Sequence, residues 1–165
     1  MAVIASLLAL IRRAYRPRIS VLGRVPHEAS TDENYQFRSV DRHPEYETIP
    51  RLVLFRFANE LFFANASYFR DETLYLVDES DPPARTVLVD ASVISHADTT
   101  ALAMLDDLLD QLELRHVTLE FARARTDLKE LLDRTGISDR IGPDGFHRSV
   151  HAGVESFLRR PSPEG

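Results

Sequence analysis

The run TVLVDA, residues 86–91, constrains the fold of this chain more than any other stretch. It is short, rich in β-branched residues and bounded by turn-forming residues, which is typical of a strand buried on both faces. Such strands occur mainly in sheets that have helices against both faces. The run therefore predicts an α/β fold with parallel pairs of strands at the centre of the sheet.

Strand and helix patterns alternate on both sides of this run. RLVLFRF (51–57) and VTLEFA (117–122) predict strands because β-branched and aromatic residues dominate them. ELFFAN (60–65) predicts a further strand, joined to the first by a turn at Ala58 and Asn59. FRSV and ISVLGRVP, nearer the N-terminus, predict shorter strands. This order predicts a sandwich of helices packed against a sheet.

The predicted helices begin at polar residues that can cap them. Asn65, Asp98, Thr126 and Ser149 occupy those positions, and Gly136 is the expected stop of the third helix. Apolar residues then recur every three or four positions, as they do on the buried face of a helix. The expected inward residues are Ala66, Phe69, Thr73 and Leu76; Leu102, Leu105, Leu109 and Leu112; Leu128, Leu131 and Leu132; and Val150, Val154, Phe157 and Leu158. IGPDGF (141–146) is expected to be a loop.

Composition excludes several classes of protein. The 165 residues suit one domain, and a net charge of −6 disfavours nucleic acid as a partner. The absence of cysteine excludes disulfides, a thiol nucleophile and any Cys-ligated metal. The sequence also contains no glycine-rich phosphate-binding loop.

The N-terminus differs from the rest of the chain. An apolar run at residues 2–11 is followed by Arg12, Arg13, Arg16 and Arg18. The run is half the length of about 20 residues that a helix needs to cross a bilayer. Basic residues after an apolar helix are typical of the cytoplasmic side of a membrane span. The run therefore reads either as the end of a membrane helix or as an amphipathic helix packed on the domain.

Histidines and acidic residues give no catalytic or metal site. His147 and His151 are four residues apart, but no third ligand lies near them in the sequence. His96 has no nucleophile beside it that it could activate strongly. Asp106, Asp107 and Asp110 are expected on the solvated face of a helix. We therefore predict no catalytic residue, no metal and no cofactor.

The triplet Asp98-Thr99-Thr100 lies at the end of the loop that connects the predicted central strand to the next predicted helix. A capping role explains the triplet fully, because Asp98 can accept hydrogen bonds from the first free N–H groups of the helix. A hydroxyl at a helix N-terminus is also well placed to carry a phosphate or to contact an anion. The triplet is consistent with both interpretations.

The segment VLVDASVISHADTTALAML, which contains this triplet, resembles the signature of the STAS domain. STAS domains are shared by sulfate permease (SulP) transporters and anti-sigma-factor antagonists. Asp98, Thr99, Thr100 and Leu102 match the signature, whereas Ala101 stands where the antagonists usually have glycine. The flanks YRPRISVLGRVP and RHPEYETIPRLVLFRFANELFFANASYFRD resemble the transporter branch.

The resemblance implies a STAS-like mixed β-sheet with helices packed against it, over residues 19–160. Residues 1–18 would be the stump of the last transmembrane helix with a juxtamembrane linker, and 161–165 a disordered tail. The implied function is that of the cytoplasmic C-terminal STAS domain of a SulP-type sulfate, bicarbonate or other anion transporter at the plasma membrane, acting in regulation and assembly and soluble as an isolated chain.

The resemblance also implies partners and alternatives. The partners would be the transmembrane domain of the same transporter, a second STAS domain or a regulatory protein. The alternative is a free-standing anti-sigma-factor antagonist that is switched by phosphorylation of Thr99. A third alternative is a module that binds nucleotides or anions weakly, since residues 91–98 contain no Lys or Arg.

Overall fold

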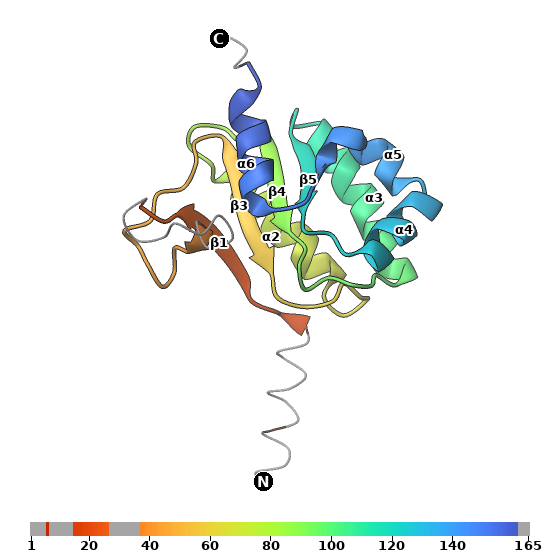
Figure 1. The fold of residues 1–165 in the computed structure, drawn as a ribbon. Coiled ribbons are helices and arrows are strands. Elements are labelled where there is room, and N and C mark those ends of the chain that lie inside the picture. The colour runs from red at the N-terminus through yellow and green to blue at the C-terminus, as the bar shows by residue number, and fades with distance from the viewer. Residues whose placement is uncertain (1–5, 7–14, 27–36, 162–165) are drawn as a thin grey trace.

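The computed structural model describes residue 6 and residues 15–26 and 37–161. Within these residues a six-stranded sheet has the strand order β2-β1-β3-β4-β5-β6 (Figure 1). The strands are β1 (Ile19–Arg24), β2 (Phe37–Ser39), β3 (Leu52–Phe57), β4 (Thr86–Asp90), β5 (Thr118–Ala122) and β6 (Phe146–His147). β1 is antiparallel to β2 and β3, while β3 to β6 run parallel, so the sheet is mixed.

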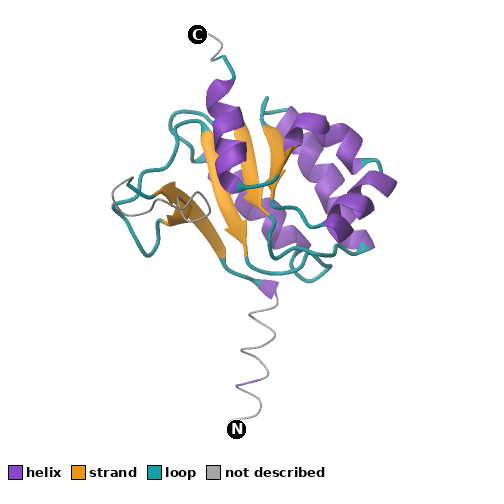
Figure 2. Cartoon of the chain, in the orientation of Figure 1, coloured by secondary structure: helices purple, strands orange, loops and turns teal. Residues whose placement is uncertain are grey.

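Helices cover both faces of this sheet (Figure 2). They are α2 (Ala66–Asp78), α3 (Thr99–Glu113), α4 (Thr126–Arg134), α5 (Ile137–Ile141) and α6 (Val150–Arg159). Residues of α2 to α5 pack into the larger apolar core on one face, and α6 packs into a smaller core on the other. The α/β fold predicted from the sequence, a STAS-like mixed sheet with helices against it, is confirmed.

β4 is one of the two central strands of the sheet, in agreement with the prediction of a central strand. All five of its residues are buried, and Val87, Leu88 and Val89 have no exposed surface. Val89 lies in register with Phe55 of β3 and Phe121 of β5, and these side chains enter the larger core. Leu88 points to the other face and packs beneath α6. A strand that contributes to both cores needs apolar side chains on both faces, as Val87, Leu88 and Val89 provide.

β4 ends at a buried carboxylate, Asp90, which has no exposed surface. The Nε of Arg56 donates to its Oδ2 at 2.6 Å, and the Nε of Arg123 donates to its Oδ1 at 3.0 Å. Burial alone would raise the pKa of Asp90, but the hydrogen bonds from Arg123 and Arg56 outweigh it and hold the pKa below its ordinary value. The cluster ties together the carboxyl ends of three neighbouring strands.

A second buried carboxylate, Glu120, lies on the α6 face of β5. Its Oε2 is 2.7 Å from the Nε2 of His147 in β6, and its Oε1 pairs with the Nη1 of Arg160 after α6. Burial would raise the pKa of Glu120, but the hydrogen bonds from His147 and Arg160 outweigh that effect and lower it. Glu120 therefore joins the edge strand and the last helix to the sheet.

ELFFAN is not a strand, and this prediction was wrong. β1 and β4 already pair with the two edges of β3, so no edge is left for a hairpin partner. The segment turns instead, because the Asn65 Oδ1 accepts from the N–H of Phe62 at 3.0 Å and its Nδ2 donates to the carbonyl of Glu60 at 2.8 Å. Only Leu61 forms a bridge, with Ala97.

Two of the predicted caps were also wrong. The Asn65 side chain makes its hydrogen bonds within the turn before α2 and makes no capping hydrogen bond to the helix. Thr126 is the first residue of α4, and Arg125 occupies the cap position without a side-chain bond. The predicted caps at Asp98 and Ser149 are confirmed, with Ser149 accepting from the N–H of Ala152 at 3.0 Å.

The region predicted as a loop at residues 141–146 is more ordered than expected. It contains the end of α5, a 3-10 turn (Pro143–Gly145) and the first residue of β6. Strands of two residues carry no periodicity, so no local pattern could have indicated β6. Leu158, predicted to point inward, is 54% exposed and lines a groove beside Ile49 and Pro50, beyond the core under α6.

The predicted boundaries at residues 18 and 160 are not tested by the fold. Most of 1–18 and of 161–165 lies outside the described residues. The same is true of HEASTDENYQ (27–36), for which the polar sequence predicts a loop. In the part of the chain that is described, none of the helices is both long enough and apolar enough for a membrane crossing.

Replacing Asp90 by Ala should lower the free energy of unfolding by about 2–4 kcal/mol, because two guanidinium groups lose their shared carboxylate. The cost is below that of a fully buried pair, since Arg56 and Arg123 are 39% and 32% exposed. Urea denaturation measures the change. Asp78→Ala is the matched control, because the Asp78–Arg115 pair lies at the surface and its loss should cost less than about 1 kcal/mol. An equal loss of unfolding free energy in both variants would contradict the stabilising role given to the buried carboxylate of Asp90.

Stability should fall as the pH falls below the ordinary pKa of glutamate, about 4.3. A carboxylate whose pKa is lowered in the folded state stabilises the fold above its unfolded pKa, and that stabilisation is lost as the pH falls through the folded pKa. Glu120→Gln should therefore show a shallower acid-induced loss than the unaltered chain in urea titrations at a series of acidic pH values. Parallel curves for the two proteins would refute a contribution from Glu120.

Candidate functional site

The candidate site lies at the carboxyl ends of β3 and β4, where the loops after the two strands meet. β3 and β4 are adjacent and parallel, so their following loops leave the sheet at the same end. The N–H of Leu61 donates to the carbonyl of His96 at 3.3 Å, and the N–H of Asp98 donates to the carbonyl of Leu61 at 3.3 Å. These bonds join the start of α2 to the start of α3.

Asp98 uses both of its carboxylate oxygens at this junction. Its Oδ1 accepts from the N–H of Ala101 at 2.8 Å, which is the predicted cap of α3. Its Oδ2 accepts from the N–H of Phe63 at 2.8 Å, in the loop after β3. Asp98 therefore caps α3, as predicted, and also anchors the loop that leads into α2, which was not predicted from the sequence.

Glu60 makes the reciprocal connection from the β3 loop to the β4 loop. Its carboxylate accepts from the N–H of Ser95 at 2.7 Å, from the Ser95 hydroxyl at 2.6 Å and from the N–H of His96 at 2.8 Å. Burial would raise the pKa of Glu60, but these hydrogen bonds outweigh it and lower the pKa. Glu60 therefore stays ionised at neutral pH and fixes the loop that precedes Asp98.

Thr99 and Thr100 are both exposed at the first turn of α3. Neither hydroxyl has a hydrogen bond within the described part of the chain. Phe63, on the other side of Asp98, is 65% exposed. The corner thus presents two free hydroxyls, the N-terminus of a helix and an aromatic ring to whatever lies against this end of the domain.

The other sequence candidates have structural partners or stand apart. His96 is exposed in its loop, as expected for a surface histidine. His147 contacts Glu120, while His151 contacts Glu155 one turn further along α6. Among residues 15–26 and 37–161, no group of three His, Asp or Glu residues could hold a metal ion.

Sequence reasoning missed the polar groups that fix the junction. Glu60 was read as part of a strand, although an acidic residue at the start of an apolar run is a signal of a special role. Glu120 was likewise passed over in the middle of VTLEFA, where a charge interrupts a buried strand. The three acids Asp90, Glu120 and Glu60 all find partners from distant parts of the chain.

Comparison with known families gives one match over most of the chain. Residues 43–155 match the family described as the STAS domain. A probable sulfate transporter from Mycobacterium tuberculosis is 35% identical over 159 residues, which cover 96% of this chain and 27% of the transporter. The chain thus spans about a quarter of that relative's length.

Solved structures with the same fold come from both branches of the family. The murine Solute Carrier 26 family member A9 anion transporter superposes with a TM-score of 0.75 at 18% identity, over 93% of this chain and 24% of that one. The Bacillus anti-sigma-factor antagonist SpoIIAA in its unphosphorylated form superposes with a TM-score of 0.55 at 13% identity, over 70% of this chain and 96% of that one. At these identities the likeness is one of fold alone.

Asp98→Ala should lower the free energy of unfolding by about 1–2 kcal/mol, because the cap of α3 and the anchor of Phe63 are lost together. Asp98→Asn should cost less, since asparagine keeps an oxygen that can accept from Ala101. Urea denaturation of the two variants gives the comparison. If both substitutions lower the free energy of unfolding equally, the hydrogen bond from Ala101 to residue 98 does not stabilise α3.

Proposed function

The chain belongs to the STAS domain family, and on that premise we propose that it is the cytoplasmic C-terminal domain of a SulP-type transporter. The observation that carries the proposal is the 35% identity to a probable sulfate transporter over nearly the whole chain. The transported solute would be sulfate, bicarbonate or a similar anion. The domain would act in regulation and assembly at the cytoplasmic face of the plasma membrane, with no catalytic role.

The topology supports a particular orientation of such a domain. Ile19, the first residue of β1, lies in register with Phe57, the last residue of β3. The chain therefore enters the domain at the end where the Asp98 corner lies. In a transporter this end would face the transmembrane domain, and Phe63, Thr99 and Thr100 would be available for contact with it. A second STAS domain or a regulatory protein would use the remaining surface.

Immunoblotting of separated membranes and cytosol, with an antibody against this domain, tests the proposal. We expect a membrane band much heavier than the 18.8 kDa of this chain, because the domain would be part of a larger polypeptide. A band near 18.8 kDa in the cytosol would contradict the proposal. An antibody against a known cytosolic protein controls for the separation.

The alternative is a free-standing anti-sigma-factor antagonist that is switched by phosphorylation at Thr99. The observation that favours it is the exposed Thr99 side chain directly after the cap residue of α3. Incubation with anti-sigma kinases should then place one phosphate on the chain. Thr99→Ala should abolish incorporation, while the neighbouring Thr100→Ala should leave it unchanged. No incorporation with any such kinase would count against this alternative.

Binding of nucleotides or anions at the corner has less support. The helix N-terminus offers N–H groups and a partial positive charge, but Ala101 already donates its N–H to Asp98. The aspartate also places a negative charge where an anion would sit. Any such binding at this corner would be weak.

A further inference from the structure

A cavity lined by arginines lies beside the start of β1, separate from the Asp98 corner. Its volume is about 840 Å³. The polar residues that line it are Arg16, Arg18, Asp41, Arg42, Asn59 and Tyr68. Four segments therefore form one basic hollow: the lead-in to β1, the turn after β2, the loop after β3 and the first turn of α2, which supplies Tyr68.

The arginines of this cavity outnumber the acid that lines it with them, Asp41. Arg16, Arg18 and Arg42 are exposed, and the described part of the chain gives none of them an ion pair. Arg115 and Arg140, elsewhere on the surface, are each paired with aspartates. With three arginines and Asp41, the lining carries a net charge of +2, whereas the whole chain carries −6. Positive charge is therefore concentrated here on an acidic protein.

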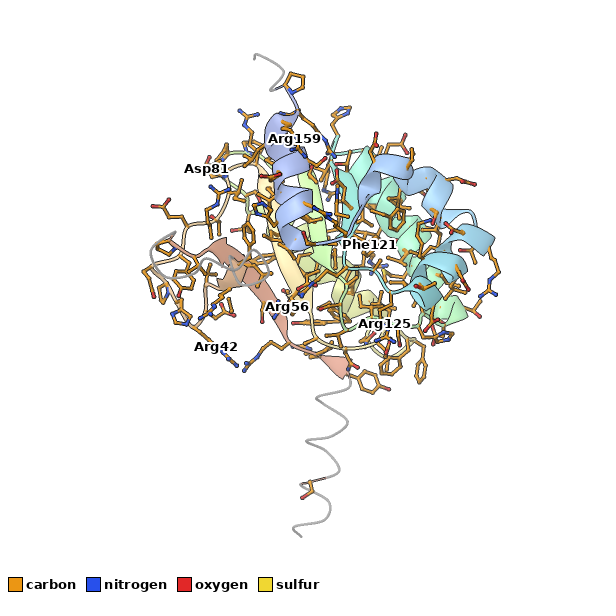
Figure 3. All side chains as sticks on the ribbon, viewed as in Figure 1. Arg42, Arg56, Asp81, Phe121, Arg125 and Arg159 are labelled. Carbon is orange, nitrogen blue, oxygen red and sulfur yellow. The ribbon has the colours of Figure 1, made fainter. Side chains whose placement is uncertain are left out.

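The cavity opens at the end of the domain where the chain enters. The carbonyl of Arg18 accepts from the N–H of Ala58 at 3.2 Å, which holds the lead-in to β1 against the loop after β3. Figure 3 shows Arg42, Arg56 and Arg125 on this lower side of the domain and Arg159 on the opposite side. One exposed aromatic ring accompanies the charge: Tyr15, one residue before Arg16, is 51% exposed.

We propose that this cavity binds the phosphate of an anionic phospholipid headgroup, so that the domain touches the membrane surface directly. The inference rests on the proposed function, which places a membrane at this end of the domain. Guanidinium groups match phosphate oxygens in geometry and charge. Basic residues next to a membrane segment are attracted by anionic lipids, and tyrosine is favoured at the membrane interface.

Sedimentation of the full 165-residue chain with lipid vesicles tests the proposal. One set of vesicles contains phosphatidylcholine alone, and the other contains added phosphatidylglycerol. We expect preferential binding to the anionic vesicles that weakens as salt is added. The double variant Arg18→Gln, Arg42→Gln should weaken that binding by a factor of about 25, since each basic residue near an anionic surface contributes a factor of about 5.

Two further variants separate the cavity from a general effect of charge. Arg24→Gln with Arg134→Gln makes the same change in net charge on exposed arginines away from the cavity, and it should leave binding within about twofold of the unaltered chain. Arg18→Lys with Arg42→Lys keeps the charge but not the planar fork, and it should weaken binding by less than the glutamine pair but measurably, because an ammonium group cannot pair with phosphate through two parallel hydrogen bonds. Circular dichroism checks that every variant is folded. An equal loss in the Arg24/Arg134 variant would overturn the assignment to this cavity.

Two other results would overturn the proposal. Equal binding to both kinds of vesicle, unaffected by any variant, would show that the apolar residues 2–11 bind the bilayer without the arginines. Glycerol phosphate could also shift the amide NMR signals around the cavity while the vesicles show no anionic preference. That result would make the cavity a site for a soluble phosphate compound and reject the lipid assignment.

The vesicle experiment and the fractionation experiment can contradict their proposals independently of each other. A heavy membrane band without lipid preference in the vesicle assay would leave the transporter proposal intact and reject the lipid site alone. A small cytosolic band, together with vesicle binding that depends on Arg18 and Arg42, would reject the transporter proposal while the lipid chemistry of the cavity remained.

Discussion

The buried carboxylate of Asp90 is the interaction on which the arrangement of this domain most depends. It closes the central strand, and its oxygens bind Arg56 at the end of β3 and Arg123 just after β5. A charge without exposed surface would be very costly alone, so both arginines have to be in place when the strands pair. The ends of three parallel strands are thereby aligned at one level, and every loop of the candidate site starts from that level.

Two further carboxylates, Glu60 and Asp98, join the loops that leave this aligned edge. Glu60 reaches from the β3 loop to Ser95 and His96, while Asp98 reaches back from the β4 loop to Phe63. Each loop thus supplies the acceptor for N–H groups of the other. A contact made by Phe63 or a phosphate added at Thr99 would act on both helix N-termini together, because neither loop can shift without breaking bonds to its neighbour.

The sequence predicted those features that depend on local pattern. The central strand, the long helix after Asp98 and the capping role of that residue follow from periodicity and from the chemistry of one side chain. The prediction of a strand at ELFFAN was wrong because the residues of this segment favour a strand, while β1 and β4 already occupy both edges of β3. The carboxylate contacts join residues more than twenty positions apart, and Arg123 adopts a left-handed backbone conformation with φ of 56°. Such features arise from the assembled fold, so no window of sequence contains them.

The two outermost strands have a consequence for the behaviour of the protein in concentrated solution. β2 has three residues and β6 has two, so both margins of the sheet are much shorter than its centre. An unpaired margin is a template for another chain, and a short one offers too few backbone groups to hold it. The two outermost strands of the described sheet therefore offer another chain few backbone groups with which to pair.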